Sequence, residues 1–262
     1  MYLGQNSIIY PVLNRNIQEN ELSYRSPSER GIPYKDITLK TEDGFAIKGW
    51  LMLQPSAKTT QTVLYFHANA GNRGTRMDCI EQMYKEIGLN VFIIDYRGYG
   101  DSEGRPSESA LKLDSEASMQ YLLSSDEIDP NSIYLFGRSL GGAVAIYGAS
   151  KFTQTRGLIV ENTFTSIPNL LKDAYGGFSY PLIPLLTSRW DSEQAISDVR
   201  CPTLFISGRK DETVFPSHMD AFYHKYCNPK ESKEVPEGGH NVTWRVAKSS
   251  YVERILSLSN ST

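Results

Sequence analysis

Ser139 has the surroundings that point most clearly to chemistry in this chain. It is the central residue of a Gly-x-Ser-x-Gly pattern at 137–141, after a short apolar run at 133–136 and before the helix-forming residues 143–147. Strand, sharp turn and helix in this order predict a nucleophile elbow with the serine at its apex. The glycines allow strand and helix to approach, and the helix N-terminus supplies N–H groups for developing negative charge.

A serine hydroxyl needs a general base, which in elbow proteins follows the serine and an intervening acid in the chain. Of the four histidines, His67 precedes Ser139. His218 and His224 lie among polar residues of an expected helix, so we expect them at the surface or half-buried. His240 follows the last expected strand in a glycine-containing loop. His240 is therefore the predicted base.

Asp211 is the predicted acid that orients this base. It follows the strand expected at 203–207 and lies between the serine and the histidine in sequence. The adjacent Glu212 is the rival, but residues 213–216 favour Asp211 as the head of the turn. Carboxyl ends of neighbouring parallel strands meet at one edge of a sheet, which is where such groups gather.

Two backbone N–H groups are expected to hold the oxyanion. One belongs to Leu140, directly after the serine, and the other comes from the loop after an early strand. Residues 67–72 form that loop, and we choose Asn69 as its donor. His67 is then expected to hold the loop in shape and not to act as a second base.

Alternating strands and helices must position these groups. Residues 35–41 and 45–53 alternate as a hairpin, and the following segments read as strands and helices in turn. Strands are expected at 63–66, 91–95, 133–136, 158–161, 203–207 and 231–235, and helices at 76–88, 107–125, 140–150, 217–226 and 243–258. This order predicts an α/β fold with a mostly parallel central sheet and helices on both faces.

Residues 163–190 interrupt the alternation with three prolines, paired glycines and many large apolar side chains. We interpret them as a small cap over the catalytic edge, although an irregular helix packed on the core fits the individual residues equally well. Phe164, Tyr175 and Phe178 are the predicted substrate-contacting residues.

The chain has 262 residues, 40% of them hydrophobic, a net charge of −3 and a pI of about 5.9. This length suits one domain, which we place at 35–258 with the cap insertion at about 163–190. Residues 1–34 form an N-terminal extension and 259–262 a tail. The charge does not favour nucleic acid, and three scattered cysteines indicate neither a disulfide framework nor a metal site. No organic cofactor is implied. With no signal peptide and no run of ~18 apolar residues, the chain as given is expected to be soluble.

Taken together, these motifs resemble the bud-emergence-type serine hydrolases and, more distantly, the protein depalmitoylases. The resemblance spans roughly 35–258 and rests on His-Ala-Asn-Ala-Gly-Asn at 67–72, Asp-Tyr-Arg-Gly-Tyr-Gly at 95–100, Phe-Gly-Arg-Ser-Leu-Gly-Gly at 136–142, Glu-Asn-Thr-Phe-Thr-Ser at 161–166 and Gly-His-Asn at 239–241. It implies an α/β-hydrolase fold and a triad of Ser139, Asp211 and His240. Ala68 departs from the family's usual glycine. Members commonly carry an N-terminal membrane anchor just upstream of the point where this chain begins, so localisation and membrane association stay open.

The expected function is that of a serine esterase or thioesterase. The predicted substrate is a small or lipid acyl ester, or an S-acylated protein. A peptidase of the prolyl oligopeptidase type shares the triad order, but its usual access-restricting domain does not fit this length. A catalytically silent scaffold with the same fold is the third reading.

Overall fold

The computed structural model describes residues 9–11, 25–176, 181 and 183–247. Their strands form one eight-stranded sheet in the order β1-β2-β4-β3-β5-β6-β7-β8. β1 pairs with β2, and β2 with β4, in antiparallel fashion, and all later pairs are parallel. The strands are β1 (Lys35–Lys40), β2 (Ala46–Met52), β3 (Thr62–Phe66), β4 (Asn90–Asp95), β5 (Ile133–Arg138), β6 (Gly157–Glu161), β7 (Thr203–Gly208) and β8 (Lys230–Val235).

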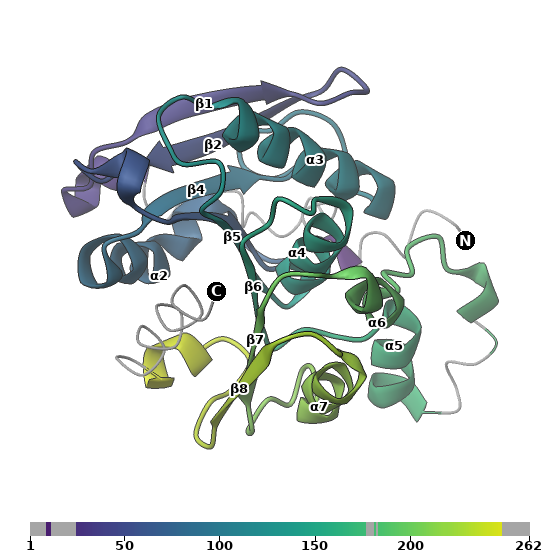
Figure 1. Ribbon diagram of the computed structural model, residues 1–262. Helices are drawn as coiled ribbons and strands as arrows, with labels where there is room; N and C mark the ends of the chain where they lie inside the picture. The colour runs from purple at the N-terminus through teal and green to yellow at the C-terminus, as the bar shows by residue number, and fades with distance from the viewer. Residues whose placement is uncertain (1–8, 12–24, 177–180, 182, 248–262) are drawn as a thin grey trace.

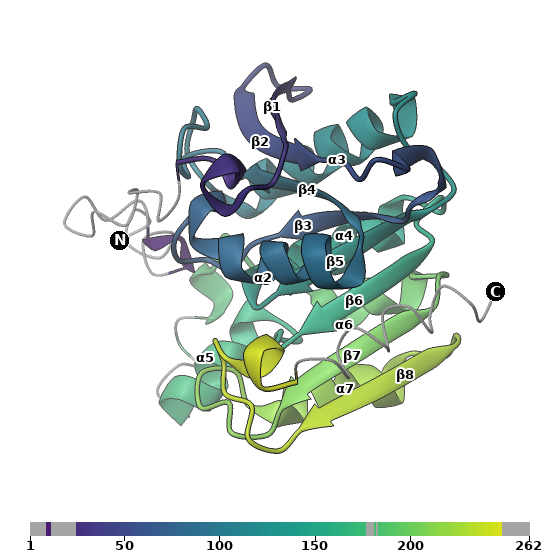
Figure 2. The same ribbon diagram turned by 90° about the vertical axis from the view of Figure 1, so that its left-hand side faces the viewer.

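Helices cover both faces of this sheet (Figure 1). They are α2 (Met77–Glu81), α3 (Glu108–Ser124), α4 (Leu140–Lys151), α5 (Ile167–Tyr175), α6 (Ser192–Ala195) and α7 (Pro216–Lys225). In Figure 2, α2 and the yellow helical turn at 243–247 lie in front of the sheet, whereas α3, α4 and α7 lie behind it. The predicted fold class is therefore confirmed.

Burial on both faces explains the composition of the central strands. Every residue of β3, β4, β5, β6 and β7 is buried. Alternate side chains enter two separate cores, so that Leu64 and Phe66 belong to one and Val63 and Tyr65 to the other. Strands buried on both faces are continuously apolar, as the sequence is here.

Three segments differ from the expected elements. The helix expected at 76–88 is divided into a 3₁₀ turn (Arg73–Arg76), α2 and a π-helical turn (Gln82–Ile87), and it ends as expected at Gly88, whose φ is 80°. Within 163–190 the structure contains α5 and a 3₁₀ turn (Ile183–Leu185). The short helix α6 was not expected.

Candidate active site

Ser139 occupies a strained turn between β5 and α4. Its φ of 55° and ψ of −123° lie outside the regions that non-glycine residues prefer, a conformation that persists only where the surroundings enforce it. A Cβ atom at Gly137 would lie 2.0 Å from the Gly141 carbonyl oxygen, and one at Gly141 would lie 2.0 Å from the Phe66 carbonyl oxygen. Only glycine fits at either position, so the close approach of β5, α4 and β3 depends on both.

Ser139, His240 and Asp211 form a hydrogen-bonded chain. His240 Nε2 lies 3.1 Å from Ser139 Oγ, and His240 Nδ1 lies 2.7 Å from Asp211 Oδ2. The other carboxylate oxygen of Asp211 accepts from the backbone N–H groups of Thr213 and Val214, each at 2.9 Å. A neutral imidazole fits this chain by donating from Nδ1 to the carboxylate and accepting from the serine at Nε2. The structure thus brings together the three residues that the sequence predicted.

Of the two acids weighed from the sequence, Asp211 is the carboxylate that meets His240, whereas the adjacent Glu212 is exposed. Asp211 is almost fully buried and His240 is half-buried. A buried carboxylate with two backbone donors cannot rotate freely. Its hydrogen bond with His240 Nδ1 therefore fixes the orientation of the imidazole.

Asn162 connects the loops that carry these groups, a role that sequence reasoning missed. Its Oδ1 accepts from Gly208 N at 2.8 Å, directly after which the Asp211 turn begins. Its Nδ2 donates to the carbonyl oxygens of Gly239 and His240 and to Thr243 Oγ1, at 3.3, 3.2 and 2.9 Å. The residue has a φ of 47°, a conformation in which asparagine is enriched. The sequence signal that could have indicated this role is an asparagine directly after strand β6, at the edge where the other site residues gather.

The chain of three residues opens into a cavity of about 660 Å³. Leu140 and Asn69, the two predicted oxyanion residues, both line it together with Ser139 and His240. The side-chain amide of Asn69 donates to the Ile9 carbonyl oxygen at 3.3 Å. The loop that carries Asn69 is thereby joined to the N-terminal segment.

Apolar side chains form much of the remaining wall. Phe164 lines the cavity as predicted, and the same wall includes Ile167, Leu170, Leu171 and Val214.

The other two predicted substrate-contacting residues, Tyr175 and Phe178, are not found in the cavity wall among the described residues. Tyr175 does not line the cavity, and its side chain is 61% exposed. The reason is its position in the last turn of α5, where a rise of roughly 12 Å from Ile167 carries it beyond the cavity. Phe178 lies outside the described residues.

Residues of the N-terminal extension contribute to the cavity and to the contacts around it. Ile9 lines the cavity. Tyr10 is fully buried, accepts a hydrogen bond from Trp190 Nε1 at 3.0 Å and contacts Ser188 Oγ at 3.4 Å. Burial raises the pKa of Tyr10 to about 12, so its hydroxyl stays protonated. Apolar burial and hydrogen bonds hold Tyr10 against Ser188 and Trp190.

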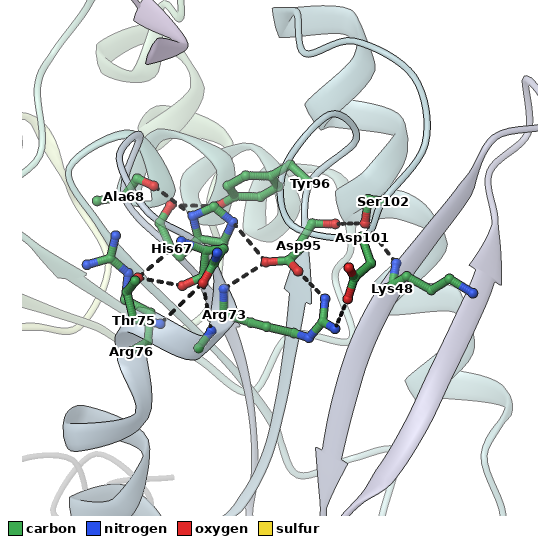
Figure 3. Close-up of polar contacts among 12 residues, drawn as sticks. Lys48, His67, Ala68, Arg73, Thr75, Arg76, Asp95, Tyr96, Asp101 and Ser102 are labelled. Atoms are coloured by element: carbon green, nitrogen blue, oxygen red, sulfur yellow. Dashed lines mark hydrogen bonds and ion pairs between the residues drawn. The ribbon is translucent and has the colours of Figure 1, made fainter. Parts of the chain in front are cut away.

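His67 is the first residue of the 67–72 loop (Figure 3) and is fully buried. Its Nδ1 is 2.7 Å from the Ala68 carbonyl oxygen, and Tyr96 donates its hydroxyl to the His67 carbonyl at 2.9 Å. Burial, with the nearby Arg76 guanidinium, lowers the pKa of His67 to about 3. A neutral, buried histidine bonded to its own loop agrees with the expected structural role.

His218 was expected at the surface or half-buried, and that expectation is wrong. It is buried in α7, with Nδ1 2.8 Å from Thr165 Oγ1 and Nε2 2.8 Å from Asp173 Oδ2. Its neighbour Ser217 is exposed, so the polar local composition gave no sign that His218 is buried. His224 is exposed.

Comparison with known proteins bears on the fold and the family of this chain. Residues 61–176 match the family model described as alpha/beta hydrolase fold. The chain is 38% identical to protein bem46 of Schizosaccharomyces pombe, over 93% of this chain and 82% of that one. It is 36% identical to the membrane protein YNL320W of Saccharomyces cerevisiae, over 97% and 91%. The chain belongs to the bem46-type α/β-hydrolase family. The predicted resemblance is thereby confirmed.

Solved structures of α/β hydrolases share the fold. An α/β hydrolase from Vibrio vulnificus superposes with a TM-score of 0.78, at 20% identity over 97% of this chain and 91% of its own. The Pyrococcus furiosus esterase Pf2001 gives a TM-score of 0.76, at 21% identity over 92% and 95%. At these identities the likeness concerns architecture, and function has to be argued from the site.

Among the described residues, no helix is both long and apolar enough to cross a membrane. Within the same residues, no group of three or more His, Cys, Asp or Glu side chains is arranged to hold a metal ion.

Proposed function

We propose that this protein is a serine hydrolase that cleaves carboxylic ester or thioester bonds through Ser139, His240 and Asp211. The observation that carries the proposal is the hydrogen-bonded chain from Asp211 through His240 to Ser139, which opens into a largely apolar cavity. Membership of a hydrolase-fold family and an esterase among the fold neighbours support it.

In the proposed mechanism, Ser139 Oγ attacks the acyl carbonyl carbon while His240 Nε2 takes the hydroxyl proton. The backbone N–H groups of Leu140 and Asn69 hold the resulting oxyanion. His240 then gives the proton to the departing alcohol or thiol, which leaves an acyl-serine. Water, deprotonated by His240, attacks this ester, and the proton returns to Ser139 as the carboxylic acid is released.

An acyl chain is the group that fits the cavity. Its wall consists mainly of aliphatic and aromatic side chains, among them Phe164, Ile167 and Leu171. Burial of hydrocarbon contributes ~0.8 kcal/mol per methylene, so each added carbon that reaches this wall strengthens binding. A small or lipid acyl ester, or an S-acylated cysteine of another protein, is the proposed substrate class.

The test is hydrolysis of p-nitrophenyl esters and of acyl thioesters of increasing chain length. Ser139→Ala should lower kcat by at least ~10⁴-fold, since only the oxyanion hole and substrate binding remain. Ser115→Ala is the matched control, because Ser115 is buried in α3 away from the cavity. Full turnover by Ser139→Ala would refute the proposal.

The same experiment separates the alternatives. A scaffold would leave Ser139 unlabelled by a fluorophosphonate, whereas a hydrolase is labelled at that residue. A peptidase would cleave an amide as fast as an ester of the same acyl group. We expect labelling, and we expect the ester to react much faster than the amide.

A further inference from the structure

Arg76 is a cavity-lining cation whose charge is not balanced by the described residues. It lies at the end of the 3₁₀ turn before α2 and lines the cavity together with Ser139. Its Nη2 donates to the Ala70 carbonyl oxygen, and its Nε is buried without an acceptor. Among the described residues it makes no ion pair with a carboxylate. A guanidinium carries five N–H donors, so most of its hydrogen-bonding capacity is unused.

The other buried arginines of the site region are compensated. Arg73 pairs with Asp95 and, at 2.7 Å, with Asp101. Figure 3 shows Arg73 reaching toward these two carboxylates, whereas Arg76 extends to the other side of the same segment. Buried charges in proteins are normally paired, because desolvation of a lone ion is costly. Arg76 departs from this pattern within the same turn.

The same holds for Arg97, in the turn after β4, and for Arg138, at the end of β5. Arg97 pairs with Asp43 at 2.6 Å and with Asp114 at 2.9 Å. Arg138 is in register with Glu161 on the adjacent strand, which places both side chains on one face of the sheet. Each of these positions supplies a carboxylate, whereas Arg76 has no carboxylate ion-pair partner among the described residues.

The local field adds to the imbalance at Arg76. Burial and the neighbouring Arg138 both lower the pKa of Arg76. Even so, a guanidinium stays protonated at neutral pH. A positive charge with unused donors therefore faces the cavity, and an anion in that cavity would relieve both the missing hydrogen bonds and the repulsion.

We propose that Arg76 binds an anionic group, a carboxylate or a phosphate, carried by the acyl ester that Ser139 cleaves. This inference rests on the proposed function and narrows its substrate class. The cavity suits such an amphipathic molecule, because residues 69–76 contribute polar groups from Asn69, Thr75 and Arg76, whereas α5 contributes apolar ones. Arginine is suited to this role since its planar fork matches carboxylate and phosphate oxygens.

The experiment compares matched neutral and anionic substrates. One pair is p-nitrophenyl valerate and the p-nitrophenyl monoester of glutaric acid, which carries a carboxylate on the acyl chain. The other is a monoacylglycerol and its 3-phosphate, which carries the charge on the leaving group. Wild type is expected to prefer the charged member of at least one pair in kcat/KM.

Arg76→Gln tests the assignment, because glutamine keeps an N–H donor for the Ala70 carbonyl but removes the charge. The preferred anionic substrate should lose roughly 10- to 100-fold in kcat/KM, as expected for a lost charge-assisted hydrogen bond. Neutral esters should change by less than about threefold. Arg76→Lys, which restores the charge without the fork, should recover part of the preference.

Arg105→Gln is the matched control, because Arg105 is exposed and lines a different hollow beside Arg97. It should leave the preference unchanged. Equal losses on neutral and anionic substrates in Arg76→Gln would mean that Arg76 only supports the 67–72 loop, and would overturn the inference. An absence of anionic preference in wild type would also overturn it. The proposed function fails separately, if Ser139→Ala retains turnover of the neutral esters.

Discussion

The two sides of the cavity are built in different ways. On the strand side, the groups around Ser139 are buried and held by named hydrogen bonds, several of which converge on Asn162 and Asp211. On the cap side, α5 buries only Ile167 and Pro168, and Leu170 and Leu171 are half-exposed. The proposed catalytic residues thus lie in loops that many hydrogen bonds connect, whereas the apolar wall from α5 is less buried. We expect changes on the first side to affect rate and those on the second to affect substrate choice.

Asp211→Asn should produce the largest effect on the strand side. The amide preserves shape but favours the wrong tautomer of His240, which in the proposed mechanism costs about 10⁴-fold in kcat. Steady-state kinetics on the best neutral ester measure this, with Glu212→Gln as the control. If Glu212→Gln were the more damaging variant, the assignment of the acid would be wrong.

Asn162→Ala should come next. It removes the donor and acceptor that join the Gly208 turn to the His240 loop, and a displacement of about 1 Å at the base can cost ~10²-fold in kcat. KM should change little, because Asn162 does not line the cavity. A variant with normal kcat would show that the loops hold their positions without this connection.

His67→Gln should change how the free energy of unfolding depends on pH, because His67 is a buried group on the strand side of the cavity. Burial lowers the pKa of His67 to about 3, below its unfolded value near 6.5, so in this window the unfolded chain binds the extra proton. This group's contribution to stability is therefore complete above pH 6.5 and is lost as the pH falls toward 3. At pH 5 wild type should have lost about 2 kcal/mol through this group, which the variant should not lose.

Urea unfolding at pH 7 and pH 5 measures that difference. Asp95 and Asp114 change the stability with pH in the opposite direction to His67. Burial raises the pKa of each to about 6, so the folded protein binds these protons at a higher pH than the unfolded chain does. Both carboxyls are present in wild type and variant, so the comparison isolates the histidine. An identical pH dependence in the two proteins would show that His67 does not stay neutral.

Leu170→Ala should have the smallest effect. Leu170 is half-exposed on α5, so we expect a loss of about 1 kcal/mol or less in the free energy of unfolding. The chain-length optimum in the p-nitrophenyl series should shift, with a loss of roughly 5- to 10-fold in kcat/KM on the longest esters that still react. A uniform loss on all chain lengths would place Leu170 with the strand side.

Local patterns predicted the sheet, most of the helices and the order of Ser139, Asp211 and His240. Apolar runs and glycine turns are readable because they reflect forces between near neighbours. The prediction of Leu140 and Asn69 as oxyanion donors stays a prediction, although both line the cavity. Kinetic measurements on variants around Leu140 and Asn69 are needed to test whether their N–H groups hold the oxyanion.

The features that were missed depend on contacts between distant parts of the chain. Tyr10 meets Trp190, and Asn162 meets His240, across separations that no local pattern encodes. Arg76 has an ordinary local sequence, and what sets it apart is that it makes no ion pair with a carboxylate of the described residues. Tyr175 was misplaced for a related reason, since composition identifies an apolar segment but not which of its turns reaches the cavity.

The contact between Tyr10 and Trp190 also limits when the N-terminal segment can join the cavity during synthesis. Tyr10 is made 180 residues before its partner. At ribosomal speeds of 5–20 residues per second, this corresponds to about 10–40 s in which the early segment has no docking surface. A nascent chain can therefore form β1 to β6 before Tyr10 docks, and His240, which is made later still, completes the proposed site, so that hydrolytic competence should be among the last properties that the newborn protein gains.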